Sequence, residues 1–414
     1  RGLVWQMKTL LEELAARRRF GMKPGLETLR AVLASLGDPQ KRVCALHVAG
    51  TNGKGAVCAL LDAALAAAGC STGRYTSPHL VSLEERFFLG GAPVPLARLD
   101  AEAARLQTAA CDGLTYFEYL TALAFRLYAA EGLDYAILET GLGGRLDATN
   151  LCVPRLAVIT RVGLDHCDWL GDTLERIAAE KAGIIKPGVP VVLGANAPEV
   201  RAVVARRAAE VGAPFVYAPD CVPPARIPAD LALPGAFNRE NAQTAQAALK
   251  TLFAAKPAVY AAALKGFARV AWPGRFQRVG RFLVDGAHNP PAAHALADAL
   301  REDFPHARFE LVAGFCADKD SETVLRILAP FVARAFAVKT SSPRSLPAEE
   351  TAARMRAAGL DARPLPSLSA ALAATRGPAL VCGSLFLAGE ALVELGALPR
   401  PAAVPPLSEQ LKPS

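Results

Sequence analysis

The chain has 414 residues, of which 52% are hydrophobic and 21% are charged, and its formal net charge is +7. This composition excludes a disordered or fibrous protein, and the length favours two domains. No apolar run is long enough and free enough of charge to span a bilayer, and residues 1–11 lack a signal-peptide core, so we predict a cytoplasmic protein that makes no membrane contact.

The cysteines and the basic residues exclude two further classes of site. The nine cysteines are dispersed without a C-x-x-C pair, which indicates buried free thiols in a reducing compartment and not a zinc site. The one short basic run, at 17–19, has no interleaved aromatic residues, so we expect no nucleic acid partner.

The first part of the chain alternates between helical and strand patterns. In chain order we predict helices at 5–20 and 26–36, a strand at 43–48, a helix at 54–68, and within 72–91 a strand, a loop and a β-ribbon that carries residues 85–88. Helices at 99–110 and 115–130 and strands at 135–138 and 156–160 follow. The short apolar strands are typical of parallel strands buried on both faces, and the helix at 54–68 is apolar on every side, so we expect it in a core.

The alternation continues and restarts after Trp272-Pro273-Gly274-Arg275, which we interpret as a hinge. The later predicted elements are helices at 173–183, 239–253 and 257–266, strands at 189–193 and 214–217 with a helix between them, then strands at 281–284, 309–312, 335–338 and 379–381 and helices at 291–300, 322–328 and 348–357. We therefore predict an ATP-binding domain at 1–270, a smaller α/β domain at 271–396 and a proline-rich tail at 397–414.

A glycine-rich segment follows the first predicted strand. His47 to Ala56 reads His-Val-Ala-Gly-Thr-Asn-Gly-Lys-Gly-Ala. A strand that runs through such a turn into a helix directs backbone N–H groups and the positive end of the helix dipole at one spot, which suits a polyphosphate, and Lys54 would reach the outer phosphates. The predicted ATP-binding residues of this loop are Gly50, Thr51, Asn52, Gly53, Lys54, Gly55 and Ala56.

The loop lacks the hydroxyl that usually follows its lysine and holds Mg²⁺, because Gly55 and Ala56 stand there. The metal must be held elsewhere. Polar residues follow two later strands, with Glu139 after the first and Arg161 to His166 after the second. Ligands of a doubly wound sheet sit beyond the carboxyl ends of its strands, so we expect Glu139 and Asp165-His166 to meet the Lys54 loop at one edge.

A dozen motifs across the chain carry a resemblance to a known family. They are His47–Gly55, Tyr75–Leu80 with Glu85-Arg86, Thr115–Glu118, Glu139–Asn150, Gly163–His166, Glu180–Ile185, Leu233–Gly235, Asn241-Ala242, Trp272–Arg275, Asp285–Pro290, Asp318–Asp320 and Gly383-Ser384. In this order and over residues 5–395 the chain resembles the folylpolyglutamate synthase/dihydrofolate synthase family of the Mur ligase superfamily. The resemblance implies an α/β fold: a P-loop domain with a parallel-rich central sheet, plus a smaller Rossmann-like C-terminal domain.

The resemblance implies an ATP-dependent ligase that adds L-glutamate to dihydropteroate and to tetrahydrofolate or folylpolyglutamate through an acyl phosphate, releasing ADP and phosphate. A ligase with only one of these two activities is an alternative. A Mur-type peptidoglycan ligase and a nucleotide-binding protein without catalysis are two others. The loop at Thr76–His79 argues against the peptidoglycan ligase, and the retained metal-site residues argue against the pure binder.

The resemblance also assigns site residues and cofactors. It implies two Mg²⁺ ions, one held by Ser77 and Glu139 and the other by Glu139 and His166, a carbamate on Lys181, and a monovalent cation. It places Asn241 on the adenine side. The remaining implied residues are Arg275, Asp285 and His288 toward the nucleotide, Thr76, Ser77 and Pro78 toward the pteroate or folate, and His288 and Ser384 toward glutamate. Lys54, Glu139, His166 and Lys181 are the predicted catalytic residues, and we expect a monomer with small-molecule substrates.

Three positions depart from the family pattern. Ala56 stands where the family has serine, Asn238 where it has glutamine, and Cys382 where it has threonine. None of the three removes a predicted metal ligand. Tyr116 and Phe117 are expected in the core and receive no role in the site.

Overall fold

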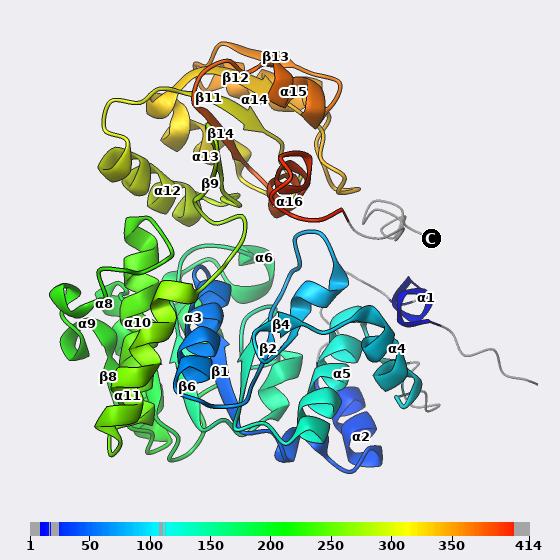
Figure 1. Cartoon of the computed structure of the whole chain (residues 1–414), viewed down its shortest axis with the longest axis vertical. Helices are drawn as coiled ribbons and strands as arrows, with labels where there is room; N and C mark the ends of the chain where they lie inside the picture. The colour runs from blue at the N-terminus through cyan, green and yellow to red at the C-terminus, as the bar shows by residue number, and fades with distance from the viewer. Residues whose placement is uncertain (1–8, 16, 18–24, 107–110, 112, 401–414) are drawn as a thin grey trace, which may run out of the picture. The chain divides into compact units, whose positions relative to one another are not determined.

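A computed structural model describes residues 9–15, 17, 25–106, 111 and 113–400 (Figure 1). The chain divides into two compact units. Unit 1 comprises Arg1–His79, Leu83–Leu231 and Glu240–Val270, and unit 2 comprises Leu80–Ser82, Ala232–Arg239 and Ala271–Ser414. The sequence did not predict the two short segments that join unit 2. Most of the predicted tail, from residue 401 on, lies outside the described residues.

The sheet of unit 1 has eight strands in the order β4-β3-β2-β5-β1-β6-β7-β8. Their bounds are β1 (Ala45–Ala49), β2 (Thr72–Tyr75), β3 (Phe87–Leu89), β4 (Ala92–Pro93), β5 (Tyr135–Glu139), β6 (Leu156–Ile159), β7 (Val191–Leu193) and β8 (Phe215–Tyr217). Pairing is antiparallel only between β2 and β3 and between β3 and β4, so the sheet is parallel-rich as predicted. The central strand β1 lies between β5 and β6.

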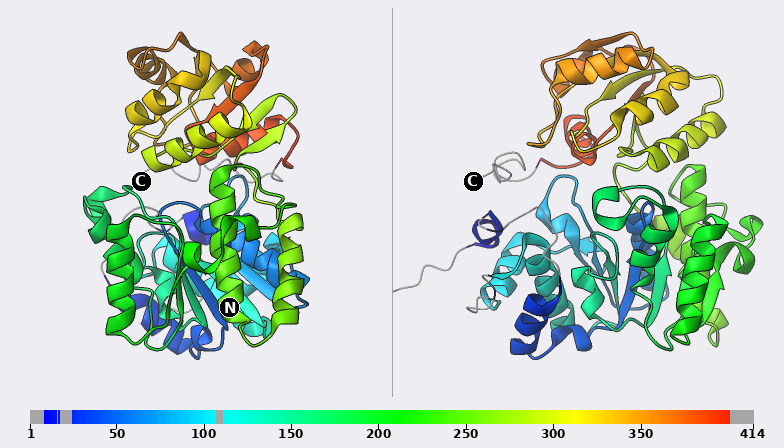
Figure 2. Two further views of the ribbon diagram at one scale, coloured as in Figure 1. Left: turned by 90° about the vertical axis from the view of Figure 1, so that its left-hand side faces the viewer. Right: turned by 180° about the vertical axis from the view of Figure 1, so that it is seen from behind.

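Helices cover both faces of this sheet, as Figure 2 shows from two further sides. The helices described in this part of the chain are α1 (Leu10–Ala15), α2 (Glu27–Ser35), α3 (Lys54–Ala67), α4 (Leu96–Ala104), α5 (Tyr116–Glu131), α6 (Cys167–Leu170), α7 (Leu174–Ala182), α8 (Pro198–Glu210), α9 (Ala218–Cys221), α10 (Ala236–Leu252) and α11 (Pro257–Leu264). Helix α5 begins at a capping box, in which Thr115 and Glu118 satisfy each other's backbone N–H groups, and it ends at left-handed Gly132. Of the predicted helix at 5–20, only the part at Leu10–Ala15 lies in a described helix.

One prediction in this unit was wrong. Glu85 and Arg86 were expected on a β-ribbon, but they end a 3-10 helix, η2 (Leu83–Arg86). The hydroxyl and the N–H of Thr76 bond the carbonyl oxygens of Glu85 and Arg86. These bonds close the loop, and ladder pairing therefore begins only at Phe87, opposite Tyr75.

Unit 2 contains a six-stranded sheet in the order β13-β12-β11-β14-β10-β9. Its strands are β9 (Gln277–Val279), β10 (Phe282–Val284), β11 (Phe309–Ala313), β12 (Val332–Ala337), β13 (Ala362–Pro364) and β14 (Ala379–Cys382), and its later helices are α12 (Pro290–Asp303), α13 (Ser321–Leu328), α14 (Ala348–Ala357), α15 (Leu368–Ala374) and α16 (Leu385–Glu394). Two clusters of buried side chains cover the sheet, one with α12–α14 and the other with α15 and α16. The predicted second α/β alternation is confirmed, although the sequence missed the short edge strands β9 and β13 and the last two helices.

Two further sequence predictions can be compared with the structure. All nine cysteines are free thiols, but Cys167 is exposed, because it opens the short α6 directly after His166. Within the described residues, no helix combines the length and the apolar character needed to cross a bilayer.

Candidate functional site

The phosphate-type loop leaves the central strand of unit 1 and enters α3. Its backbone is fixed by the end of the neighbouring strand β6. The N–H groups of Thr51 and Asn52 donate to the carbonyl of Arg161 at 2.8 and 3.2 Å, and the Thr51 hydroxyl lies 3.1 Å from the carbonyl oxygen and 3.0 Å from the nitrogen of Gly163. The loop therefore contacts the segment after β6 at Arg161 and Gly163, and its meeting with Asp165 and His166 stays a prediction.

Two glycines of the loop cannot be replaced without movement. A Cβ on Gly50 would lie 1.8 Å from the hydroxyl oxygen of Thr160, which itself donates to the carbonyl of Asn52 at 2.7 Å. Gly53 caps α3 with a left-handed φ of 87°, and a Cβ there would lie 2.2 Å from Oδ1 of Asn241. Asn241, the predicted adenine-side residue, thus lies against the loop.

Lys54 and Lys181 both contact the loop through carbonyl oxygens. Nζ of Lys54 donates to Thr51 at 3.2 Å, and Nζ of Lys181 donates to Gly50 at 2.9 Å. Lys181 sits in the last turn of α7 and is 3% exposed. Burial lowers the pKa of Lys181 to about 7, with the positive charge of Lys54 as a second cause, so much of this amine is neutral near pH 7.

Glu139 ends β5, next to the central strand, and is 4% exposed. Its Oε2 accepts the backbone N–H of Ser77 at 3.0 Å, so the first two predicted metal ligands are in direct contact. The following residue donates its N–H to Val48 on β1, which places the end of β5 beside the start of the loop. Thr76, Ser77 and Pro78 follow β2 at the same edge of the sheet.

His166 differs from these residues in its exposure. Its backbone is left-handed at a φ of 52°, and its side chain is 43% exposed, with Nε2 at 3.9 Å from the Asp165 carboxylate. The described residues contain no group of three or more His, Cys, Asp or Glu side chains arranged to hold a metal. Glu139 still fits Mg²⁺ as a hard oxygen donor, since Mg²⁺ usually takes one or two carboxylates and completes its shell with water and substrate phosphates. His166 would add an imidazole nitrogen, which is a borderline donor.

The predicted site residues of unit 2 gather at the ends of β10 and β14. Oδ2 and Oδ1 of Asp285 accept the N–H groups of Phe276 and Ala287, each at 2.8 Å. His288 contacts the carbonyl of Gly286 through Nδ1 at 2.7 Å, Arg275 donates to Gly274 at 3.0 Å, and the Ser384 hydroxyl caps α16 by accepting the N–H of Phe386 at 3.1 Å. Burial raises the pKa of Asp285. Because the two oxygens of Asp285 accept the N–H groups of Phe276 and Ala287, this side chain supports the loops that carry Arg275 and His288.

Sequence reasoning missed two residues that support the loop. One is Thr160, described above. The other is Asn196, whose Oδ1 accepts the N–H of Val162 at 2.7 Å and whose Nδ2 donates to the carbonyl of Thr160 at 3.0 Å. Asn196 follows β7, so the rule that located Glu139 and Asp165, polar residues after buried strands, could have found it.

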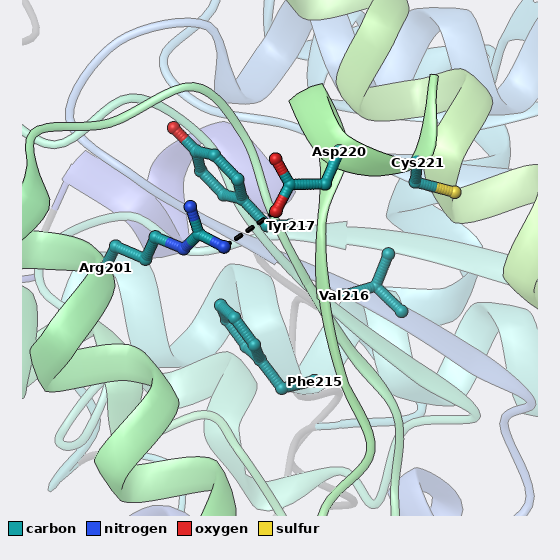
Figure 3. Close-up of a pocket in the computed structure, with 6 residues that line it drawn as sticks. All are labelled: Arg201, Phe215, Val216, Tyr217, Asp220 and Cys221. Atoms are coloured by element: carbon teal, nitrogen blue, oxygen red, sulfur yellow. Dashed lines mark hydrogen bonds and ion pairs between the residues drawn. The ribbon is translucent and has the colours of Figure 1, made fainter. Parts of the chain in front are cut away.

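A hollow of about 340 Å³ lies at the edge of the sheet of unit 1 (Figure 3). It is lined by Arg201, Phe215, Val216, Tyr217, Asp220 and Cys221. Arg201 pairs with Asp220 at 2.7 Å and stacks over the ring of Tyr217 at 4.1 Å. None of the predicted site residues lines this hollow, so it is not the candidate active site.

A glycine-rich loop on the central strand, with a buried carboxylate and a buried lysine beside it, defines a P-loop protein of the Mur ligase type. Comparisons agree: residues 48–211 match the Mur ligase middle domain, and residues 274–384 match the Mur ligase, glutamate ligase domain. The chain is 36% identical over 345 residues to the dihydrofolate synthase/folylpolyglutamate synthase of Bacillus subtilis, covering 75% of this chain and 80% of the relative.

Solved structures give the same result. E. coli FolC in complex with DHPP and ADP superposes with a TM-score of 0.82 at 33% identity, over 94% of this chain and 97% of that one. A bifunctional folylpolyglutamate synthase/dihydrofolate synthase with Mn, AMPPNP and L-glutamate bound gives a TM-score of 0.79 at 32% identity, over 91% and 95%. The chain belongs to the folylpolyglutamate synthase/dihydrofolate synthase family of the Mur ligase superfamily, a family of ATP-dependent ligases, as its motifs predicted.

Proposed function

We propose that the protein joins the amino group of L-glutamate to a carboxylate of dihydropteroate and of tetrahydrofolate or folylpolyglutamate, with cleavage of ATP to ADP and phosphate. The observation that carries the proposal is the contact of the buried Glu139 with the half-buried Ser77, at the edge where the Lys54 loop leaves β1. Membership of the family supports the choice of substrates.

The loop residues Gly50 to Ala56 bind the ATP phosphates through their backbone N–H groups and the N-terminus of α3, and Lys54 neutralises the outer phosphates. Asn241 contributes on the adenine side. We assign Arg275 and His288 to the nucleotide as well. Asp285 acts behind them, because both of its oxygens are engaged by backbone N–H groups.

Ser77 and Glu139 would hold one Mg²⁺, and Glu139 and His166 a second. The ions would supply positive charge that offsets the repulsion between an incoming carboxylate and the phosphates of ATP. The oxygen donors of Ser77 and Glu139 suit this hard cation, and His166, with its exposed side chain, can reach outward to the second ion.

Lys181 is proposed to react with CO₂. The ammonium group first loses a proton to solvent, and the neutral amine then attacks the carbon of CO₂. An N–C bond forms, a C=O π bond opens to C–O⁻, and a second proton leaves the nitrogen to solvent, which gives an anionic carbamate. The lowered pKa supports this step, since only the unprotonated amine is nucleophilic. A carbamate at this position would orient the second Mg²⁺.

The ligation then follows in two steps. An oxygen of the acceptor carboxylate attacks the γ-phosphorus of ATP, and the bond between the γ-phosphorus and the bridging oxygen of the β-phosphate breaks. ADP departs, and the acceptor is now an acyl phosphate. The glutamate amine next attacks the acyl carbon, loses a proton, and phosphate departs with the former carboxylate oxygen. Thr76, Ser77 and Pro78 are proposed to contact the acceptor, and His288 and Ser384 the glutamate, each group acting mainly by orientation.

A ligase with a single activity is the second candidate, since both activities use the same two steps and differ only in the acceptor. A monovalent cation in the site, a monomeric state and a cytoplasmic location stay predictions. Purified protein should release ADP only when ATP, Mg²⁺, L-glutamate and an acceptor are all present. Dihydropteroate and a reduced folate should be supplied separately: release with one alone would select the single-activity ligase, and release with neither would overturn the proposal.

A further inference from the structure

The segment from Gly141 to Asn150 received no role from the proposed reaction, although it follows Glu139 directly. It reads Gly-Leu-Gly-Gly-Arg-Leu-Asp-Ala-Thr-Asn. Most of it is buried or half-buried, and it ends in the short 3-10 helix η4 (Ala148–Leu151). We call residues 141–150 the brace, because they begin two residues after Glu139 and their backbone packs against the last turn of α7, which carries Lys181.

At its first contact the brace fixes the turn after Glu139. Oδ2 of Asp147 accepts the N–H groups of Gly141 and Leu142 at 2.8 and 3.0 Å. Oδ1 of the same carboxylate accepts the N–H and the hydroxyl of Thr149 at 3.0 and 2.5 Å. Asp147 is 5% exposed, so these four bonds replace its hydration and hold the chain that leaves β5 in one conformation.

The same network reaches the strand that carries the phosphate loop. Nε2 of His47, on β1, lies 2.7 Å from the Thr149 hydroxyl. That hydroxyl gives its proton to Asp147, so Nε2 of His47 must be the donor and must carry a proton. Burial lowers the pKa of His47 to about 3, in agreement with a neutral ring. The start of the loop and the turn after Glu139 are therefore joined by one chain of buried hydrogen bonds.

At its second contact the brace holds the last turn of α7, where Lys181 lies. The N–H of Arg145 donates to the carbonyl of Glu180 at 2.8 Å, and Nδ2 of Asn150 donates to the carbonyls of Arg145 and Gly183 at 2.9 and 3.2 Å. The backbones also approach closely. A Cβ on Gly144 would lie 2.8 Å from the carbonyl oxygens of both Glu180 and Lys181, so only glycine permits this contact.

We propose that the brace is a positioning device, in which Asn150 and Gly144 hold the Lys181 amine on the carbonyl of Gly50 while Asp147 holds the turn after Glu139 in register with it. The proposal rests on the proposed function, in that Lys181 and Glu139 are the groups to be positioned. Asn150 and Gly144 act through Lys181 and do not themselves touch a substrate.

The test measures the reactivity of the Lys181 amine toward acetic anhydride by mass spectrometry, in protein without nucleotide or acceptor. Asn150→Ala and Gly144→Ala are the brace variants. Gln246→Ala is the matched control for Asn150, because the buried Gln246 amide also donates to two oxygens, at 3.2 and 3.0 Å, on Arg226 and Tyr260. Gly377→Ala is the control for Gly144, since a Cβ there meets nothing within 4 Å.

We expect acetylation of Lys181 to rise about tenfold in both brace variants and to stay at the wild-type rate in both controls. In steady state, kcat should fall by about 10² while the KM values for acceptor and glutamate stay within about threefold, because a catalytic group displaced by about 1 Å loses rate and not ground-state binding. If Gly144→Ala does not fold, Asn150→Ala decides alone.

Wild-type labelling of Lys181 in the brace variants would overturn the proposal. So would an equal rise in the controls, because that would mark general loosening of the fold. The labelling needs no ligase activity. If the wild-type protein forms no glutamate product but the variants and controls show the expected labelling, the proposed function is refuted and the positioning role of the brace is still supported.

Discussion

In unit 1 the candidate catalytic groups are aimed by the backbone of neighbouring strands, whereas in unit 2 the candidate binding groups are largely engaged in holding their own loops. Glu139 and Lys181 bond Ser77 and Gly50, which belong to the proposed metal site and to the phosphate-type loop. In unit 2, Asp285 bonds the backbone of its own turn at Ala287 and of a neighbouring loop at Phe276, and Ser384 bonds the backbone of its own turn.

This difference suggests how the two units divide the work. Of the groups proposed to meet the reacting atoms, Glu139 ends a central strand, and Lys54 and Lys181 lie in helices from which they contact the loop after β1. The groups proposed to select the nucleotide and glutamate sit on loops whose conformation is fixed by buried polar side chains. Substitutions in unit 1 should therefore change kcat strongly, and those in unit 2 should change stability and KM.

The largest effect is expected for Glu139→Gln. The amide keeps the volume of the carboxylate and can still accept the Ser77 N–H, but it removes the charge that would hold both Mg²⁺ ions, so kcat should fall by about 10³. Turnover and the thermal midpoint should be measured together. Glu131→Gln is the control. Glu131 is exposed and pairs with Arg98, so this substitution should leave turnover unchanged. Wild-type turnover in Glu139→Gln would refute the metal assignment.

Lys181→Met should lower kcat by about 10² and change the pH dependence of stability. In the folded protein burial lowers the pKa of Lys181 to about 7, from its ordinary value of 10.5. Between these two values the unfolded chain binds more protons than the folded one, so this lysine makes stability rise with pH over that range and contributes nothing to the slope outside it. Denaturant unfolding of both proteins from pH 6 to 10 would measure the slope. An unchanged slope in the variant would show that Lys181 is not the cause.

Gly53→Ala separates backbone strain from a contact in the site. The residue has a left-handed φ of 87°, which costs an alanine about 1–2 kcal/mol, and its Cβ would also meet Asn241. Gly69→Ala is the control, with a φ of 82° and nothing within 4 Å of the Cβ. Both should lose similar stability, but only Gly53→Ala should raise the KM for ATP, by about tenfold. Equal KM values would mean that the contact with Asn241 has no bearing on nucleotide binding.

The smallest effect is expected at Ser384, in unit 2. Ser384→Ala removes the N-cap of α16 and should cost about 1 kcal/mol. Ser367 caps α15 of the same unit in the same way, and Ser367→Ala should cost about as much. A rise in the KM for glutamate in Ser384→Ala alone would assign the hydroxyl to the substrate. If neither variant changes that KM, Ser384 is only a cap.

Much of this site could be predicted from the sequence, because the phosphate loop and the residues after buried strands are local signals. The strand before Gly50, the turn from Gly50 to Gly53 and the helix that starts at Lys54 lie within a few residues of one another. Glu139 is marked by the apolar run that precedes it. The order of the strands could not be predicted, since pairing β1 between β5 and β6 brings together residues about 90 and 110 positions apart.

Several contacts of the site could not be predicted either, because they join segments that are far apart in sequence. The engagement of both Asp285 oxygens, the contact of Lys181 with Gly50 and the support from Thr160 and Asn196 all depend on segments that meet only in the fold. The short edge strands β9 and β13 gave too few residues for a clear periodicity. The resemblance supplied roles for Lys181 and Asp285, but not the contacts that explain them.

In the proposed reaction the acceptor carboxylate is phosphorylated before glutamate attacks it. An acceptor with ¹⁸O in the reacting carboxylate, incubated with ATP, Mg²⁺ and L-glutamate, tests this directly when the released phosphate is analysed by ³¹P NMR. One ¹⁸O atom per phosphate is the predicted result, because the carboxylate oxygen leaves with the phosphoryl group. Glutamate product formed with unlabelled phosphate would contradict the account.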